Sequence, residues 1–278
     1  MDLAFFPGCT LKTSARELEV STLAAMERLG VHLVELPRWN CCGTVYSMTD
    51  DDLAHQIAPV RDLARAAEQG SERLVTVCSF CYNTLKRADI LMRTSPEKRD
   101  AINAFMDDEV DYTGQVEVIH LLSLLRDDIG WGEVAARVER PLAGLKVVAY
   151  YGCTLTRPQA AAIDTVEAPT VMEDCLRALG ADVPGFPLAT ECCGAYEVVG
   201  SPGAVEQRRQ RIITAAQRLG AGVIALSCPL CASNLQQPDL PVVYFTQLLA
   251  LALGATPEEC GLSPDEAGAL QGGGSVGG

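Results

Sequence analysis

The chain is poor in basic residues. It has 22 Lys and Arg against 36 Asp and Glu among 278 residues, which gives a formal net charge of −14. Proteins that bind nucleic acids, or the anionic surface of a membrane, do so through clustered Lys and Arg side chains. The composition therefore argues against nucleic acid and against anionic lipid as binding partners.

A long hydrophobic run is also missing. The longest apolar stretch, Val242 to Ala255, has 14 residues and contains Thr246 and Gln247, whereas a membrane-spanning helix needs about 20 apolar residues. The first residues, Met1 to Phe6, include Asp2 and no basic run, so they do not read as a signal peptide. We expect a cytoplasmic protein without direct membrane insertion, attached at most peripherally through partner subunits.

Most familiar catalytic motifs are absent. The sequence contains no phosphate-binding Walker loop, no GxGxxG and no Ser-His-Asp pattern. It also lacks a ferredoxin-type CxxCxxCxxxC run and a flavin motif. The histidines, His32, His55 and His120, show no ligand spacing, so each is expected to be structural or exposed. The chemistry must therefore come from another residue type.

That residue type is cysteine, of which the chain has 12. Cytosolic thiols stay reduced, so metal ligands or redox groups are more plausible than disulfides. Ten of the cysteines form a repeated C…CCG…CxxC pattern. The gap from the lone cysteine to the pair is 31 residues in the first copy and 38 in the second, and the gap from the pair to CxxC is 35 and 34. The candidate ligands are Cys9, Cys41, Cys42, Cys78 and Cys81, and then Cys153, Cys192, Cys193, Cys228 and Cys231.

The secondary-structure pattern repeats with the cysteines. Apolar runs at Leu3–Phe6 and Leu145–Tyr151 read as buried strands that lead into Cys9 and Cys153. Strands that alternate with helices indicate parallel βαβ units, whose ligands bind at the carboxyl ends of the strands. We therefore predict an α/β fold of two pseudo-symmetric half-domains, each with a small, mostly parallel sheet flanked by helices.

The expected boundaries follow from the repeat. They are an N-terminal domain at residues 1–132, a linker at 133–144, a C-terminal domain at 145–260 and a flexible tail at 261–278, the last part of which is rich in glycine. Asp50, Asp51 and Asp52 are expected to lie at the solvated N-terminus of a helix, where the helix dipole favours carboxylates. Cys175 lies on an apolar helical face and is expected to be a core residue, and Cys260 has no assigned role.

Three functions are possible for the ten cysteines: a zinc site, an iron–sulfur cluster and redox disulfide chemistry. A structural zinc site takes four ligands, but each copy of the pattern offers five. Adjacent cysteines suit two neighbouring metals better than one small ion, which favours an iron–sulfur cluster. Redox disulfide chemistry without metal is the third possibility, because CxxC also occurs in thioredoxin-like sites.

The motifs resemble those of the CCG-domain family, and in particular the B subunit of heterodisulfide reductase. The similarity extends over roughly Leu3 to Leu253. The segments that carry it are Phe6-Pro7-Gly8-Cys9, Trp39-Asn40-Cys41-Cys42-Gly43, Tyr150-Tyr151-Gly152-Cys153, Glu191-Cys192-Cys193-Gly194, Cys228-Pro229-Leu230-Cys231 and Tyr244-Phe245-Thr246-Gln247-Leu248-Leu249.

This resemblance implies a cofactor and a reaction. Each set of five cysteines would bind one [4Fe–4S] cluster of a non-cubane type, and all ten ligand positions are filled in this chain. The two clusters would reduce a disulfide, CoM-S-S-CoB or an analogue, to two thiols in one-electron steps. The implied partners are a ferredoxin-type C subunit and a flavin-containing A-type subunit.

Two other functions stay open from the sequence. CCG domains also occur in subunits that resemble those of lactate-utilisation, succinate/fumarate and sulfur-oxidation complexes, where the chain would transfer electrons. A structural subunit with zinc or inert clusters is the third possibility. Three basic residues follow the motifs closely, Lys12, Lys86 and Arg157, and could receive an anionic disulfide, although the sequence favours a surface charge or a helix partner for each.

Overall fold

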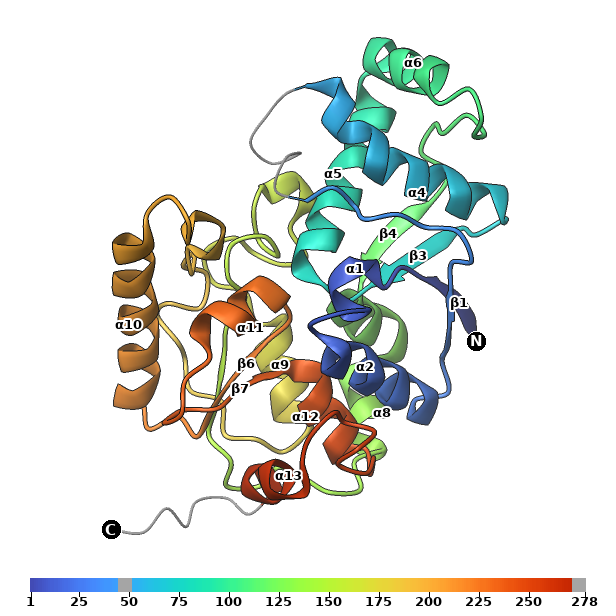
Figure 1. The fold of residues 1–278 in the computed structure, drawn as a ribbon. Helices are drawn as coiled ribbons and strands as arrows, with labels where there is room; N and C mark the ends of the chain where they lie inside the picture. The colour runs from blue at the N-terminus through green and yellow to red at the C-terminus, as the bar shows by residue number, and fades with distance from the viewer. Residues whose placement is uncertain (45–51, 272–278) are drawn as a thin grey trace.

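The computed structural model describes residues 1–44 and 52–271, and it has two parallel sheets (Figure 1). The first sheet has the order β2-β1-β3-β4, with every pair parallel. Its strands are β1 (Asp2–Phe5), β2 (His32–Glu35), β3 (Arg73–Thr76) and β4 (Glu117–His120). Helices connect them because a parallel pair needs a crossover connection. Their carboxyl ends therefore lie at one edge of the sheet.

Helices surround this sheet and continue beyond its last strand. Those between the strands are α1 (Gly8–Leu11), α2 (Arg16–Arg28), η1 (Leu53–Gln56), α4 (Ile57–Glu68), α5 (Ser79–Thr94) and α6 (Pro96–Phe105). After β4 come α7 (Leu121–Leu124), η2 (Leu125–Ile129) and α8 (Trp131–Ala136). Asp50 and Asp51 lie outside the described residues, whereas Asp52 does cap a helix: its carboxylate accepts a hydrogen bond from Ala54 N at 3.0 Å.

The second sheet repeats this plan in a smaller form. It has the order β5-β6-β7, with strands Val147–Ala149, Val223–Leu226 and Val242–Tyr244, all parallel. A single parallel bridge, between Lys146 and Asp182, occupies the place that β2 takes in the first sheet. The helices are η3 (Gln159–Ala161), α9 (Val171–Ala178), η4 (Ala195–Glu197), α10 (Pro202–Arg218), α11 (Pro229–Leu235), α12 (Phe245–Ala252) and α13 (Pro264–Gln271).

The two halves pack against each other through two pairs of helices that occupy equivalent positions in the repeat. Helix α2 of the first half packs on α12 of the second, and α9, the counterpart of α2, packs on α7, the counterpart of α12. Within the first of these contacts, Ser21 Oγ lies 2.7 Å from Thr246 Oγ1. One cluster of buried side chains includes residues from both sheets, such as Phe5 and Val148. The predicted α/β fold with two pseudo-symmetric halves is confirmed.

Two of the predicted segments contain more helix than expected. Helix α8 extends into the stretch predicted as a linker, and α13 occupies the first part of the stretch predicted as a flexible tail. Ala267 and Leu270 of α13 are buried. Residues 272–278 of that tail lie outside the described residues, and the domain boundaries themselves stay a prediction.

Over residues 1–44 and 52–271, none of the helices combines the length and the apolar character needed to cross a lipid bilayer.

Candidate metal-cluster site

The first five cysteines come together at the carboxyl edge of the first sheet. Cys9 lies in α1 directly after β1, and the pair Cys41 and Cys42 lies in the connection that follows β2. Cys78 follows β3 and is the N-cap residue of α5, in whose first turn Cys81 lies. The strand order places β2, β1 and β3 side by side, so these three chain segments deliver their cysteines to one place.

The sulfur atoms of this set are close to one another but not bonded. Cys9 Sγ lies 3.5 Å from Cys41 Sγ, and Cys42 Sγ lies 3.6 Å from Cys81 Sγ. All five are free thiols, of which Cys9 and Cys41 are exposed. The set is therefore buried on one side and open to solvent on the other.

The second five cysteines form the same arrangement. Cys193 Sγ lies 3.4 Å from Cys231 Sγ, and the Cys228 sulfur accepts a hydrogen bond from Cys231 N at 3.5 Å, at the start of α11. Cys192 accepts one from Gly194 N at 3.3 Å. Cys153 and Cys192 are half-buried, at the positions where the first set has its exposed Cys9 and Cys41.

A glycine precedes the lone cysteine in each set because no side chain fits there. Gly8 has φ +73°, and a Cβ atom on it would lie 2.7 Å from Cys81 Sγ. Gly152 has φ +66°, and its Cβ would lie 3.1 Å from Cys231 Sγ. Both are left-handed backbone conformations in which glycine has no steric penalty. These glycines let the backbone approach the sulfur atoms closely.

Contacts between thiols favour the anionic form of one sulfur and the protonated form of its partner in both sets. Hydrogen bonds from Cys41 and Cys81 lower the pKa of Cys42 to about 5. The Cys153 thiol, then Gly194 N–H and then the charge of Arg208 lower the pKa of Cys192 to about 6. The partners shift the other way: the contact with Cys42 raises the pKa of Cys41, and the contact with Cys192 raises that of Cys153. Metal ions bind the thiolate rather than the thiol, so each set offers such a sulfur beside thiols that would lose a proton on metal binding.

The donor set fits a polynuclear cluster better than one ion. Each set contains five sulfur atoms, one more than a closed zinc site takes. Among residues 1–44 and 52–271, no three Cys, His, Asp or Glu side chains are arranged around the position of a single metal ion. The number of donors, five thiols in each set, therefore suits an iron–sulfur cluster held by several thiolates.

The two sets adjoin each other across the interface of the halves. Ser79, next to Cys78, lies with its hydroxyl 2.5 Å from that of Ser227, next to Cys228. Asn83, on the same helix as Cys81, donates hydrogen bonds to Thr154 O at 2.8 Å and to Arg157 O at 2.7 Å. Side chains beside the first set therefore hold the loop that follows Cys153 in the second.

A pocket opens beside the second set. It has a volume of about 460 Å³, and its lining includes Cys153, Cys192, Arg157 and Arg208. Arg157, a predicted candidate, donates to Thr190 O at 3.1 Å and lies 3.7 Å from the exposed Glu167 carboxylate. Arg208 makes no ion pair with a carboxylate in the described part of the chain. Sequence spacing did not single out Arg208, because it lies 15 residues after Cys193.

Lys12 faces two carboxylates of its own chain. Its ammonium group donates hydrogen bonds to Glu19 and, at 2.6 Å, to Glu35 Oε2 on β2. Both are ion pairs, so the charge of Lys12 is already neutralised. This contact favours the interpretation of Lys12 as a structural charge over that of a substrate-binding residue.

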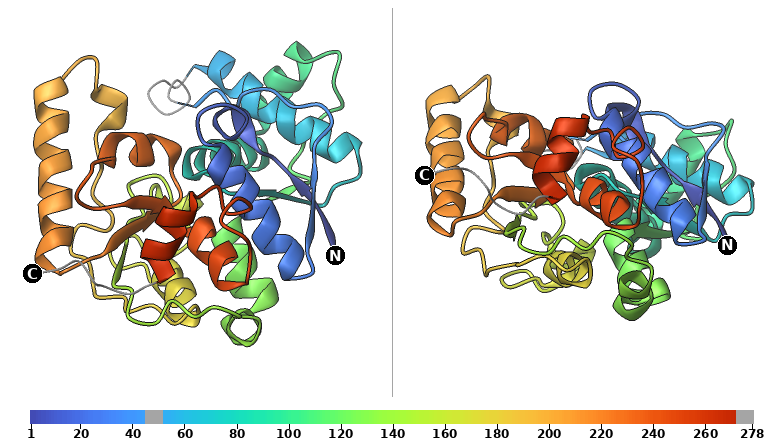
Figure 2. Two further views of the ribbon diagram at one scale, coloured as in Figure 1. Left: turned by 60° about the horizontal axis from the view of Figure 1, so that its bottom comes forward. Right: turned by 90° about the horizontal axis from the view of Figure 1, so that it is seen from below.

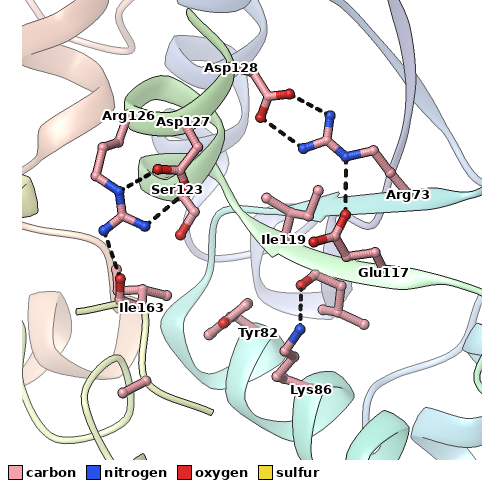
Figure 3. Close-up of a pocket in the computed structure, with 12 residues that line it drawn as sticks. Arg73, Tyr82, Lys86, Glu117, Ile119, Ser123, Arg126, Asp127, Asp128 and Ile163 are labelled. Atoms are coloured by element: carbon pink, nitrogen blue, oxygen red, sulfur yellow. Dashed lines mark hydrogen bonds and ion pairs between the residues drawn. The ribbon is translucent and has the colours of Figure 1, made fainter. Parts of the chain in front are cut away.

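Lys86 lies in a different pocket, of about 400 Å³, which Figure 3 shows. Its ammonium donates to Val118 O at 3.3 Å, and Tyr82 and Ser123 lie in the same lining. No cysteine lines this pocket. Burial raises the pKa of Tyr82 to about 12, so its hydroxyl stays protonated. Lys86 is therefore separate from the open edges of both cysteine sets.

The remaining cysteines and His120 are buried. Cys175 is fully buried in α9, as expected, and burial raises its pKa to about 12. Cys260 is also fully buried, and its carbonyl accepts a hydrogen bond from Gln247. His120 is buried and caps α7, where its Nδ1 accepts from Leu122 N at 3.2 Å. The exposed His32 lies 3.6 Å from Asp2.

The fold and the site define a class: duplicated α/β proteins with two adjoining sets of five cysteines at the carboxyl edges of their sheets. The family described as the CCG cysteine-rich domain matches residues 3–86 and again 147–236, which together hold all ten of these cysteines. The chain belongs to this family.

Full-length relatives agree with the predicted resemblance. The chain is 34% identical to the 8-methylmenaquinol:fumarate reductase membrane anchor subunit of Wolinella succinogenes, over 94% of this chain and 95% of that one. It is 28% identical to the B subunit of the ferredoxin/F420H2-dependent CoB-CoM heterodisulfide reductase of Methanosarcina acetivorans, over 94% and 92%. A protein of Archaeoglobus profundus named as similar to the heterodisulfide reductase B subunit is 26% identical, over 91% of each chain.

A solved structure shares the fold. The structure of a hypothetical protein from Helicobacter pylori superposes with a TM-score of 0.74 at 13% identity. The alignment covers 94% of this chain but only 50% of the Helicobacter chain, so this chain spans about half the length of that protein.

Proposed function

We propose that this chain is the iron–sulfur subunit of an oxidoreductase complex and that it reduces a disulfide to two thiols. Cys9, Cys41, Cys42, Cys78 and Cys81 would bind one [4Fe–4S] cluster, and Cys153, Cys192, Cys193, Cys228 and Cys231 would bind another. The observation that carries the proposal is the hydroxyl contact between Ser79 and Ser227, because it brings the two sets of five thiols next to each other.

Two adjoining one-electron centres suit this reaction. Reduction of a disulfide consumes two electrons and two protons and yields two thiols. When bound, the clusters supply one electron each and iron that has affinity for sulfur. The chain itself supplies position and charge: Ser79, Ser227 and Asn83 hold the two sets together. The exposed Cys9 in the first set and the pocket beside the half-buried Cys153 in the second leave room for a sulfur compound.

Arg157 and Arg208 would select an anionic substrate at the second set. Both line the pocket that contains Cys153 and Cys192, and Arg208 has no competing carboxylate in the described residues. Guanidinium groups bind carboxylates and phosphates through paired hydrogen bonds. The names of two Methanosarcina relatives contain CoB-CoM heterodisulfide reductase, and that disulfide, CoM-S-S-CoB, is one candidate among such substrates.

The proposed partners follow from what the chain lacks. It has no ferredoxin-type cysteine run and no flavin motif, so electrons would come from other subunits, a ferredoxin-type C subunit and a flavin-containing A-type subunit. Several relatives are subunits of multi-subunit enzymes by name, which supports an assembly of this kind.

The experiment is an assay of disulfide-dependent oxidation of reduced methyl viologen, with thiols counted as the product, on anaerobically purified protein. We expect activity in the wild-type chain and its loss in both C42S and C193S. A wild-type chain that contains both clusters but oxidises no viologen with a series of anionic and neutral disulfides would contradict the proposal.

One observation favours a second function, the transfer of electrons without disulfide chemistry. The relative from Wolinella succinogenes, at 34% identity, belongs by name to a quinol:fumarate reductase. In that case the chain would pass single electrons between a quinol and a fumarate reductase partner. Reduction of the protein-bound centres by a quinol, in a chain that reduces no disulfide, would favour this second function.

A further inference from the structure

Helix α10 carries a stripe of arginines along one edge. Arg208, Arg211 and Arg218 are all exposed, and with 3.6 residues per turn they fall within an arc of about 80°. Their spacing along the helix axis covers about 15 Å. In a chain with a net charge of −14, this stripe concentrates charge of the opposite sign.

The stripe begins at the second cysteine set. Arg208 lines the pocket that also contains Cys153 and Cys192. Arg211 is paired with Glu191, the residue before Cys192, at 3.0 Å. Arg218 makes no ion pair within the residues that the structure describes. Arg218 is therefore available to pair with a partner, and Arg208 is not neutralised by a carboxylate of the described residues.

Exposed apolar side chains lie next to the same cysteines. Tyr196 and Val198 are each 52% exposed and Val199 is 92% exposed, all in the segment between Gly194 and α10. A single exposed apolar residue needs no explanation, but three within four residues beside an arginine stripe have the composition of an interface, with Tyr and Arg enriched. Helix α10 lies at the outer edge of the molecule, away from the first half (Figures 1 and 2).

We propose that Tyr196, Val198, Val199, Arg208, Arg211 and Arg218 form the docking surface for an acidic redox protein, which exchanges single electrons with the centre at the second cysteine set. The inference rests on the proposed function, since it needs a redox centre there. In each encounter the partner loses one electron and the centre gains it, or the reverse. We call these six residues the α10 surface.

Charge and size favour a protein over a membrane. Three apolar side chains provide little insertion energy, and an acidic chain is repelled by anionic lipid. Transient redox complexes, in contrast, use interfaces under about 1,200 Å², and complementary charges speed their formation. The half-buried Cys192 adjoins this surface, so a docked partner would lie close to the centre.

The test measures binding of an acidic two-iron ferredoxin, used as the probe, to the complete anaerobic protein by calorimetry at low and moderate salt. The variant R211E/R218E is compared with K98E/R137E, which reverses two exposed charges elsewhere, one of them in the Arg137–Glu133 pair. We expect R211E/R218E to raise the Kd by about tenfold or more at low salt and to flatten its salt dependence, with little change for the control pair.

R218E alone and V199S keep the test independent of the Arg211–Glu191 pair. R218E should raise the Kd in a salt-dependent way, and V199S should raise it about threefold at every salt concentration. Equal effects of R211E/R218E and K98E/R137E, or no binding of the ferredoxin at low salt, would overturn the proposal. Binding to vesicles with anionic lipid that R211E/R218E abolishes, without ferredoxin binding, would assign the surface to a membrane instead.

Failure of the docking proposal can be distinguished from failure of the proposed disulfide reduction. Loss of binding in R211E/R218E with no disulfide reduction by the wild type would leave the docking surface in place and remove the disulfide substrate. Disulfide reduction with reduced viologen, together with ferredoxin binding that does not depend on the α10 surface, would support the disulfide substrate and overturn the docking surface.

Discussion

The two halves hold equivalent sets of five cysteines in different electrostatic surroundings. In the first half, Arg38, Arg61 and Arg65 all converge on one buried carboxylate, Glu109, at 3.1, 3.5 and 2.7 Å. Lys12 is likewise paired with two carboxylates. In the second half, Arg208 faces the open edge of the cysteines with no such partner among the described residues.

The features that the two halves share differ in kind from those in which they diverge. Sulfur positions, the glycine before the lone cysteine and the helix N-terminus at CxxC occur in both halves, because metal binding depends on them. The charges around the sulfurs differ, because recognition of a substrate or partner depends on those instead. The second half is therefore the better candidate for contact with anionic molecules.

The largest expected effect comes from removing one cysteine of each buried pair. In C42S we expect loss of the cluster of the first half, and in C193S loss of that of the second, so that iron and sulfide per chain fall by about half in each. Iron and sulfide analysis of the anaerobic variants measures this, with C175S as the control because Cys175 is a core thiol. Iron that stays at the wild-type level in C42S or C193S would refute the ligand assignment.

Replacing Gly8 or Gly152 by alanine compares how tightly the backbone packs against sulfur in the two halves. Both positions have positive φ, which costs a non-glycine residue about 1–2 kcal/mol. The new methyl group of G8A would also lie closer to sulfur than that of G152A, 2.7 against 3.1 Å. We expect G8A to lower the iron content and the thermal stability more than G152A. The reverse order would show that the cysteines of the first half shift more easily than their packing indicates.

Acid should destabilise the first half through His120. Burial lowers its pKa to about 4, well under the usual value of about 6.5. Below about pH 6.5 the unfolded chain takes up a proton that the folded chain does not, so stability falls as the pH falls. Between pH 7 and pH 5 the free energy of unfolding should drop by about 2 kcal/mol.

The second half has no equivalent group, because Tyr244 caps α12 where His120 caps α7. In H120Q, where the amide can still donate to Val77 O, this pH dependence should disappear. Urea unfolding of wild type and H120Q at the two pH values measures the effect. An unchanged slope in H120Q would assign the acid sensitivity to other groups.

The smallest expected effect concerns the two basic residues nearest the lone cysteines. R157A should raise the KM for an anionic disulfide several-fold, because Arg157 lines the pocket beside Cys153. K12A should leave that KM unchanged, because Glu19 and Glu35 already neutralise Lys12. Steady-state kinetics with an anionic and a neutral disulfide distinguish charge recognition from a general defect. If R157A raises the KM for both disulfides equally, Arg157 does not recognise the charge of the substrate.

Local features of the sequence predicted most of the fold. The apolar runs before Cys9 and Cys153 predicted strands that deliver cysteines to a sheet edge, and the structure has β1 and β5 at these places. A strand in the second half equivalent to β2 did not form beyond one bridge, because pairing depends on neighbours that the local sequence does not reveal.

Contacts between distant residues were beyond prediction. Ser79 meets Ser227 across 148 positions, and Lys12 meets Glu35 because β2 lies beside β1. Arg208 reaches the cysteines only through the course of α10. Sequence spacing therefore identified the cysteines, whose pattern is local, but neither the charges that surround them nor the adjacency of the two sets.

The most direct test of the central claim is the iron, acid-labile sulfide and zinc content of the anaerobically purified chain, combined with EPR spectra of its oxidised and reduced forms. Two clusters of four irons predict about eight iron and eight sulfide per chain, little zinc, and an EPR signal that changes when a thiol is added. Zinc in place of iron, or iron for one cluster only, would contradict a pair of adjoining redox centres.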